Sequence, residues 1–280
     1  MRPLSRRQKR WAEAHLVRGR LRAVARPAYH ALLAAEAAAA SLVSRRPEPV
    51  ETSEVTAMIK TFERPRACAR LVLSLRRLYP AMPIIVVDDS LHPAPIHGAT
   101  LVRLPFDSGV GAGRQAGLDQ VQTKFLLNLD DDFLLYRRTN LGAALDALLR
   151  HRELDLVGGR VIDLPLFITH DFRQASLFAT GAQPKIAPGT RFGLVEVLDK
   201  VPNFFLARTE AVRAVGWNPR LKRLDHADFF TRARGKVVSG LLGDFRVLHL
   251  RDPFDQEYRA FRDDLGDDLA FLRAAYPSGQ

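Results

Sequence analysis

The segment Lys124–Phe133, KFLLNLDDDF, constrains the fold of this chain most strongly. Its apolar run, Phe125–Leu127, leads into three consecutive carboxylates, Asp130–Asp132. Short apolar runs that end in polar residues are typical of buried strands, and adjacent carboxylates repel one another unless a cation or solvent compensates them. Open α/β sheets bind ligands at the carboxyl ends of their strands, so one interpretation is a site for Mg²⁺ or Mn²⁺ bound together with a phosphate. The other is an exposed acidic turn, and this segment alone does not separate the two.

Predicted strands and helices alternate along the chain, as in an α/β fold. We expect strands at 55–59, 84–87, 101–104, 156–162, 195–199, 203–207 and 245–250, and helices at 65–79, 109–122, 140–150, 209–215 and 253–276. The first two strands and the helix between them form a βαβ unit, which implies a parallel sheet with a right-handed crossover. Asp88 and Asp89 directly follow the second strand, so we expect carboxylates at its carboxyl end as well. Residues 163–190 are expected to form loops or an irregular hairpin.

Residues 1–46 differ from the rest of the chain in charge and pattern. They contain eleven Lys and Arg residues against two Glu, a net charge of +9. Their composition predicts helical structure with a break near Pro27, so we divide the chain into a basic helical arm with a linker at 1–50 and a folded domain at 51–280. The apolar part is too short for a transmembrane span, and no signal peptide is convincing. The arm fits contact with an anionic membrane surface, and a solvated arm is an equally good interpretation.

The rest of the chain is almost neutral. Subtracting the arm from the totals of 42 basic and 31 acidic residues leaves 31 basic and 29 acidic ones. This balance argues against a nucleic-acid-binding domain. The single cysteine, Cys68, excludes an intramolecular disulfide framework and a Cys-based zinc site, and it is compatible with a reducing compartment. We therefore expect a cytoplasmic protein without a nucleic-acid partner, whose arm contacts the inner face of a membrane under the first interpretation above.

The glycine-rich stretch 109–117, GVGAGRQAG, opens a predicted helix. It is a weak match to a dinucleotide-binding fingerprint, because it does not follow the first strand. A helix N-terminus near a phosphate, with Arg114 adding positive charge, is one interpretation. A flexible turn with a surface arginine is the other.

Seven short segments occur in an order and spacing that resemble a known family. They are Thr61–Arg64, Asp88–Ser90, Pro105–Phe106, Ala112–Arg114, Asp130–Phe133, Asn203–Arg208 and His226–Phe230. Together they resemble the family 2-like inverting glycosyltransferases of GT-A fold, and more narrowly the β-1,4-N-acetylgalactosaminyltransferases of ganglioside synthesis and their bacterial relatives. The resemblance covers residues 54–250. It implies an α/β domain of GT-A fold, a Rossmann-like, mixed but mostly parallel sheet flanked by helices, with the basic arm preceding it.

The resemblance also implies roles for individual residues. It implies nucleotide contacts by Thr61, Arg64, Asp88, Asp89, Arg114 and Asp130. It implies a divalent cation, Mn²⁺ or Mg²⁺, held by Asp132 and His249 against the donor diphosphate. It implies Asp228 as the base, with Asp225 as a rival, and it places Asn203 and Arg208 on the acceptor side. Two positions depart from the family pattern, since relatives usually carry Glu in place of Asp228 and Asn in place of Gln115.

The function that the resemblance implies is metal-dependent, inverting transfer of a hexose or N-acetylhexosamine, with an N-acetylgalactosamine-like sugar favoured. The donor is a UDP-sugar, and the acceptor is a hydroxyl group of a glycan or glycolipid. Such a displacement needs a general base on the acceptor side and a cation beside the departing diphosphate. Two alternatives are a nucleotidyltransferase acting on a sugar phosphate and a catalytically inactive GT-A scaffold at a membrane surface.

Several of these residues also have purely structural interpretations. His249 fits a hydrogen-bonded core histidine, and Asp88 fits a residue that caps the next turn. Asp225 and Asp228 fit an acidic pair that complements the dipole at a helix N-terminus.

Overall fold

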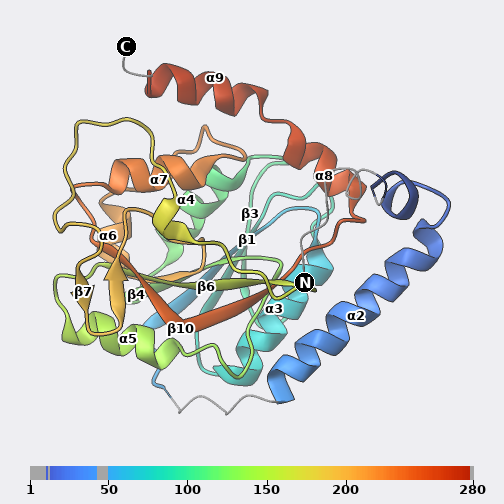
Figure 1. Cartoon of the computed structure of the whole chain (residues 1–280), viewed down its shortest axis with the longest axis horizontal. Helices are drawn as coiled ribbons and strands as arrows, with labels where there is room; N and C mark the ends of the chain where they lie inside the picture. Colours follow the sequence, from blue (N-terminus) through green and yellow to red (C-terminus); the bar gives the residue numbers. More distant parts are fainter. Residues whose placement is uncertain (1–10, 12, 43–49, 278–280) are drawn as a thin grey trace.

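A ten-stranded mixed sheet runs through the structure, with helices on both of its faces (Figure 1). The computed structural model describes residues 11, 13–42 and 50–277. The strands are β1 (Val55–Thr61), β2 (Ile84–Asp88), β3 (Thr100–Arg103), β4 (Phe125–Asp130), β5 (Phe133–Leu134), β6 (Leu156–Leu164), β7 (Arg191–Phe192), β8 (Val195–Val197), β9 (Phe205–Arg208) and β10 (Ser239–Leu250). The helices are η1 (Glu13–Val17), α2 (Arg22–Leu42), α3 (Pro65–Leu78), α4 (Val110–Gln120), α5 (Leu141–Arg150), η2 (Phe172–Gln174), α6 (Thr209–Arg213), α7 (Asp225–Ala233), α8 (Gln256–Asp263) and α9 (Gly266–Ala275).

The order and direction of the strands bring their carboxyl ends together. The order is β3-β2-β1-β4-β9-β6-β10-β8-β7, with β5 paired to β10. Strands β1 to β4 are mutually parallel, whereas β9 runs antiparallel between β4 and β6. Because β6 is parallel to β10, the carboxyl ends of β1, β2, β4, β6 and β10 all lie at one edge of the sheet. We call this the carboxyl edge, and it is where ligands bind in open α/β sheets.

Strand β1 shows why the sheet is covered on both faces. All of its residues are buried, and successive side chains of a strand point to opposite faces. Ala57 and Ile59 belong to the core cluster that includes α3 and α5, whereas Met58 belongs to the one that includes Leu118 of α4 and Phe229 of α7. Two helical layers therefore fix the sheet from both sides.

The α/β class predicted from the sequence is confirmed, but two helix predictions are wrong. Pro27 lies inside α2 rather than at a break. A proline inside a helix removes one backbone hydrogen bond, and the packing of α2 on the domain compensates for that loss. The tail at 253–276 folds as two helices, α8 and α9, and not as one.

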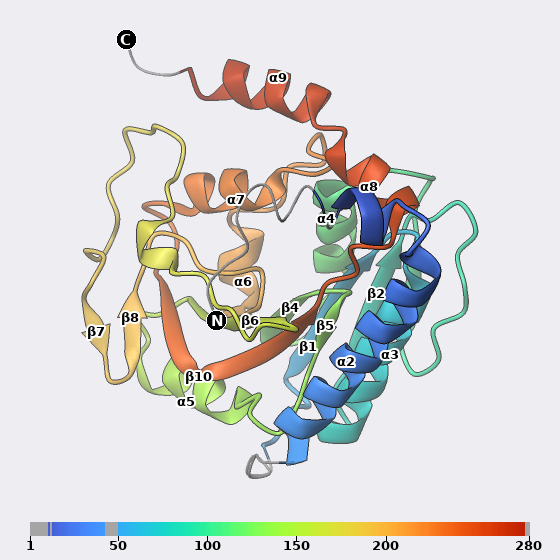
Figure 2. The ribbon, with the colours of Figure 1, turned by 45° about the vertical axis from the view of Figure 1, so that its right-hand side comes forward.

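Helix α2 lies against the domain along much of its length (Figure 2). Leu33 and Ala37 are buried in a cluster with Leu248 and Leu250 at the end of β10. The Tyr29 hydroxyl donates to the Arg251 carbonyl oxygen at 3.0 Å. The rest of the predicted arm, residues 1–10, 12 and 43–46, lies outside the described residues, and the domain division at residue 50 stays a prediction. No helix formed by the described residues is long and apolar enough to cross a membrane.

Candidate active site

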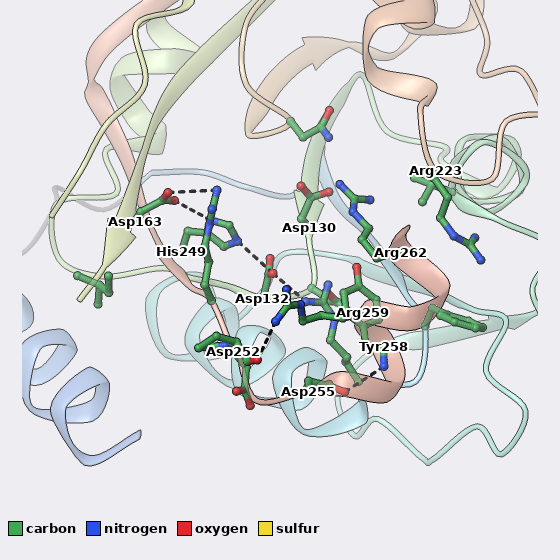
Figure 3. Close-up of a pocket in the computed structure, with 18 of the residues that line it drawn as sticks. Asp130, Asp132, Asp163, Arg223, His249, Asp252, Asp255, Tyr258, Arg259 and Arg262 are labelled. Carbon is green, nitrogen blue, oxygen red and sulfur yellow. Dashed lines mark hydrogen bonds and ion pairs between the residues drawn. The ribbon is translucent and has the colours of Figure 1, made fainter. Parts of the chain in front are cut away.

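A cleft of about 770 Å³ opens at the carboxyl edge of the sheet (Figure 3). The ends of β4, β6 and β10 contribute to its floor, and α7, α8 and residues of η1 and α2 contribute to its walls. The predicted site residues that line it are Arg64, Arg114, Asp130, Asp132, Asn203, Asp225 and His249. The other predicted site residues are not among those that line it: Thr61, Asp88, Asp89, Arg208 and Asp228.

The three consecutive aspartates at the end of β4 have different surroundings. Asp130 accepts a hydrogen bond of 2.5 Å from Arg114. The Asp131 carboxylate accepts one of 2.7 Å from the Thr61 hydroxyl and pairs with Arg64. Burial raises the pKa of Asp131 to about 6, although the Arg64 guanidinium opposes this. Asp132 is the aspartate of the three that faces His249.

His249 joins Asp132 to a carboxylate that the sequence had not singled out, Asp163. The register of β10 and β6 places His249 directly beside Asp163. The ring nitrogen Nδ1 lies 2.7 Å from the Asp163 carboxylate, and Nε2 lies 3.0 Å from that of Asp132. Burial alone would lower the pKa of His249, but the two carboxylates outweigh burial and raise it to about 9. The side chain lines the cleft, so His249 is not a residue of the apolar core.

Asp132 and His249 fit one side of a divalent cation site. A carboxylate oxygen and an imidazole nitrogen suit Mn²⁺, and a carboxylate that orients the far side of a ligating histidine is a common feature of metal sites. Although burial favours the neutral acid, the Arg64 guanidinium and His249 hold the pKa of Asp132 well below its usual range. Arg64 and the protonated His249 thus compensate the charge of Asp132, and His249 would have to release its proton to bind a cation.

The chain offers few further ligands to such a cation. Among the described residues, no group of three or more His, Cys, Asp or Glu side chains is arranged to hold a metal ion. Mg²⁺ and related ions are often held by one or two carboxylates together with substrate phosphates and water. A cation at Asp132 and His249 would take its remaining ligands in this way.

The two candidate bases lie one turn apart on α7 but face different surroundings. Asp225 is the first residue of α7, lines the cleft and pairs with Arg114. Burial raises the pKa of Asp225, and the Arg114 guanidinium opposes this. Asp228 is buried away from the cleft, where it accepts hydrogen bonds from the Tyr276 hydroxyl at 2.7 Å and from Arg232 at 2.8 Å. The geometry therefore favours Asp225 over Asp228 as the base, and the role of either residue stays a prediction.

Three of the residues predicted to contact the nucleotide, Thr61, Asp88 and Asp89, are turned into the fold. Asp88 accepts a hydrogen bond from the backbone N–H of Ser90 at 2.9 Å, which is the capping role given above as its structural alternative. Asp89 is fully buried, pairs with Lys60 and accepts a hydrogen bond from the Gly109 N–H. The Thr61 hydroxyl donates to Asp131. Direct nucleotide contacts by these three side chains stay predictions.

Arg208 lies at the opposite edge of the sheet, so its placement on the acceptor side is wrong. Strand β9 runs antiparallel to β4, and Arg208 pairs in register with Phe125 at the start of β4. Its guanidinium donates to the carbonyl oxygens of Leu148 and Leu154. Asn203, just before β9, does line the cleft, because it lies at the end of β9 that meets the carboxyl edge.

The glycine-rich segment has a packing role. A Cβ on Gly111 would lie 2.0 Å from the carbonyl oxygen of Asn218, and one on Gly113 would lie 2.6 Å from Lys60 side-chain atoms. The backbone N–H groups of Val110 and Gly111 donate to carbonyl oxygens of residues 222 and 221. Since these N–H groups are used within the fold, the interpretation of this segment as a phosphate-binding helix N-terminus is wrong.

Two contributors to the cleft come from segments that the sequence reasoning had not connected with it. Tyr258 of α8 packs its ring on the Arg64 guanidinium, 3.9 Å from the ring centroid. Asp163, near the end of β6, follows the same pattern of a strand-end carboxylate as Asp88 and Asp130. That pattern could have identified Asp163, whereas no sequence signal marks Tyr258.

Comparison with known proteins agrees with this arrangement. The family model described as "Glycosyl transferase family 2" matches residues 56–216, more than half of the chain. The chain belongs to glycosyltransferase family 2. The matched range includes Asp130–Asp132. His249 and helix α8 lie after the end of this range.

Similar curated proteins are β-1,4 N-acetylgalactosaminyltransferases. The chain is 38% identical to human "Beta-1,4 N-acetylgalactosaminyltransferase 1" over 208 residues, which cover 70% of this chain and 38% of the human protein. It is 36% identical to mouse "Beta-1,4 N-acetylgalactosaminyltransferase 2" over 205 residues, covering 69% of this chain and 39% of the mouse protein. The chain therefore spans well under half of the length of these two relatives.

The solved structures of S. aureus TarS share the fold. Residues 1–349 of TarS match with a TM-score of 0.55 and 15% identity, covering 70% of this chain and 60% of the TarS chain. The same TarS fragment in complex with UDP-GlcNAc matches with a TM-score of 0.55 and 15% identity, covering 71% of this chain and 59% of that one. Together with the family match, this likeness shows that this glycosyltransferase family 2 domain has the GT-A fold.

Proposed function

We propose that this protein transfers a hexose or N-acetylhexosamine from a UDP-sugar to a hydroxyl group of a glycan or glycolipid, with inversion at the anomeric carbon. One observation carries the proposal: Asp132, His249 and Asp225, from three separate elements, line the same cleft at the carboxyl edge. The cleft thus combines ligands for a cation with a carboxylate able to accept a proton. The identity to N-acetylgalactosaminyltransferases supports an N-acetylgalactosamine-like donor sugar.

Different residues of the cleft would have different roles in this reaction. Asp225 accepts the proton of the acceptor hydroxyl as its oxygen attacks the anomeric carbon, and a carboxylate suffices because UDP is a good leaving group. The bond from the anomeric carbon to the UDP oxygen breaks as the new bond forms, so the configuration inverts. Asp132 and His249 would hold Mn²⁺ or Mg²⁺, which would neutralise the charge that develops on the diphosphate. Walls on several sides of the cleft exclude water that would hydrolyse the donor.

Release of UDP from UDP-N-acetylgalactosamine, measured with Mn²⁺ and with EDTA, tests this proposal. We expect turnover that EDTA abolishes and that Asp132→Ala lowers by about a hundredfold or more, as expected when charge stabilisation at the leaving group is lost. The matched control is Asp146→Ala, which removes an exposed carboxylate on α5 whose ion pair among the described residues is with Arg150. Turnover that persists in EDTA and in Asp132→Ala would refute the metal role, and a product that keeps the α configuration of the donor would refute inversion.

The same assay separates the two alternative functions. A nucleotidyltransferase would release pyrophosphate from a nucleoside triphosphate and a sugar phosphate rather than UDP from a UDP-sugar. An inactive scaffold would show no turnover with any UDP-sugar, even under conditions in which it binds an anionic membrane. A screen of several UDP-sugars defines the donor.

We also propose that the outer face of α2 contacts an anionic membrane. Val24, Leu32 and Leu42 of this helix are exposed by 72%, 47% and 75%. Beside α2 lies a groove with apolar walls from α3 and β5, and its lining contains three arginines, Arg70, Arg77 and Arg137, and no acidic residue. None of these arginines forms an ion pair within the part of the chain that the structure describes. Apolar side chains flanked by free cations match the chemistry of an anionic lipid surface.

A further inference from the structure

Almost all of the Lys and Arg side chains that line the cleft form ion pairs with carboxylates. Seven Lys and Arg side chains line it. Six are ion-paired, namely Lys60 with Asp89, Arg64 with Asp131 and Asp132, Arg114 with Asp130 and Asp225, Arg223 with Asp107, Arg251 with Asp163 and Arg259 with Glu13. The seventh is Arg262 of α8. Its guanidinium has no hydrogen bond or ion pair to any described residue, although eight Asp and Glu side chains line the same cleft.

Helix α8 is fixed in place next to this arginine. The ring of Phe261 packs edge-on against Phe62, with centroids 5.1 Å apart, and against Phe106, with centroids 5.8 Å apart. The Phe261 carbonyl oxygen also accepts a hydrogen bond of 2.8 Å from Arg223. One turn earlier, Tyr258 stacks on Arg64. The free guanidinium of Arg262 is therefore carried by an anchored helix and not by a loose tail.

The direction of Arg262 is defined by its neighbours in the cleft. Its side chain extends from α8 toward Asp130 (Figure 3). Asp130 ends β4, and Asp132, two residues further on, is the candidate ligand of the cation. Arg262, Asp130 and Asp132 line the same cleft, so a group bound in it can meet all three side chains. On the proposed function, that group is the diphosphate of the donor.

We propose that Arg262 binds the diphosphate of the UDP-sugar donor, an inference that rests on the proposed function. Arginine recognises phosphate oxygens through its planar set of N–H donors. Each of the six paired cations would have to leave a carboxylate before it could do so, whereas Arg262, whose charge acts on Asp225 without a direct ion pair, would break no ion pair with a described residue. Helix α8 follows both the family-model match at 56–216 and the segments that carry the family resemblance. Neither the family-model match nor the family resemblance assigns a role to this part of the chain. Arg262 would therefore be an additional donor-binding residue.

Calorimetric binding of UDP and of uridine in the presence of Mn²⁺ tests this inference without turnover. The variants are Arg262→Gln and Arg262→Lys, and the matched control is Arg152→Gln. Arg152 is likewise exposed and unpaired among the described residues, but it precedes β6, at the edge of the sheet opposite the cleft. We expect Arg262→Gln to weaken UDP binding by about tenfold, as for one charge-assisted contact, and to leave uridine binding unchanged. Arg262→Lys should retain part of the UDP affinity, and Arg152→Gln all of it.

The other outcomes overturn the inference. Unchanged UDP affinity in Arg262→Gln, with or without a higher KM for the acceptor, would show that Arg262 does not bind the diphosphate. Equal losses for UDP and uridine would show that the arginine only maintains the packing of α8. If the wild-type protein binds neither ligand, the proposed function fails and this inference fails with it. If the wild-type protein binds UDP and Arg262→Gln binds it equally well, the role of Arg262 is refuted and the proposed function is not.

Discussion

At the scale of single residues, Asp225 and Asp228 show how position on one helix separates two similar carboxylates. They lie three residues apart at the start of α7, so the sequence ranks them only by resemblance. Asp225 lines the cleft, whereas both oxygens of Asp228 are engaged by Tyr276 and Arg232. One carboxylate can therefore reach a substrate, and the other joins α7 to the tail that follows α9.

This difference predicts opposite effects for two isosteric substitutions. Asp225→Asn should lower kcat by about a hundredfold or more, because an amide cannot accept the acceptor proton. Asp228→Asn should instead destabilise the fold by about 1–3 kcal/mol, because it weakens a buried hydrogen-bonded carboxylate, and should change kcat little. Steady-state kinetics and urea unfolding of both variants provide the check. The base assignment to Asp225 would be wrong if Asp228→Asn were inactive while stably folded and Asp225→Asn were active.

The sequence predicted some members of the site and not the contacts that organise them. Asp132 and His249 were identified through resemblance, and the structure places their side chains 3.0 Å apart although 117 residues separate them. The partner of His249, Asp163, depends on the pairing register of β6 with β10. Register between strands distant in sequence is a tertiary property, and so Asp163 could be suspected as a strand-end acid but not assigned to His249.

At the scale of elements, one face of helix α2 packs against the end of β10. Leu33 is exposed by 5% and packs in the cluster formed with the end of β10, whereas the adjacent Leu32 is exposed by 47%. His30, on the same helix, lies 3.0 Å from Asp252, beyond the end of β10. The helix thus supports the strand that carries His249.

The two leucines give a matched test of this packing. Leu33→Ala should destabilise the protein by about 2–4 kcal/mol, the usual cost of truncating a buried leucine. Leu32→Ala should change the free energy of unfolding by about 0.5 kcal/mol or less, because its side chain is half exposed. Urea unfolding followed by circular dichroism measures both. Equal small effects would indicate that α2 detaches from the domain in solution.

Helix boundaries were predictable where local signals decide them and not where packing does. Pro65 at the first turn correctly marks the start of α3. In the tail, the apolar spacing of Phe261, Leu265 and Leu269 suggests one continuous helix. The chain instead breaks after Asp263, and α9 places the Asp268 carboxylate where it accepts hydrogen bonds from the backbone N–H groups of residues 222–224. That contact involves a segment more than forty residues away, so no local pattern reveals it.

At the scale of the whole molecule, charge is distributed unevenly. Residues 1–46 have a net charge of +9, and the groove beside α2 is lined by Arg70, Arg77 and Arg137, whereas residues 47–280 taken together are nearly neutral. A bilayer with anionic lipids attracts each nearby Lys or Arg by about 1 kcal/mol, and salt screens that attraction. The proposed membrane contact should therefore depend on both lipid charge and ionic strength.

Sedimentation with vesicles tests the contact while α2 stays in place. We expect the protein to bind vesicles that contain phosphatidylserine more strongly than neutral ones. The combined variant Arg70→Gln, Arg77→Gln and Arg137→Gln should bind about tenfold or more weakly to the anionic vesicles. Arg152→Gln, which removes a positive charge elsewhere, is the control for the effect of a single charge. Equal sedimentation of the triple variant and the wild type would exclude the groove as the contact.

The position of α8 has a consequence for how such enzymes diversify. The floor of the cleft is part of the hydrogen-bonded sheet, whereas Tyr258 and Arg262 come from a C-terminal segment that meets the sheet only through side chains. Substitutions in that segment can accumulate without altering the strand pairing that positions Asp132 and His249. On the proposed role of Arg262, exchanging the last thirty or so residues between homologues would change the affinity for the donor diphosphate while the strands that carry Asp132 and His249 keep their pairing.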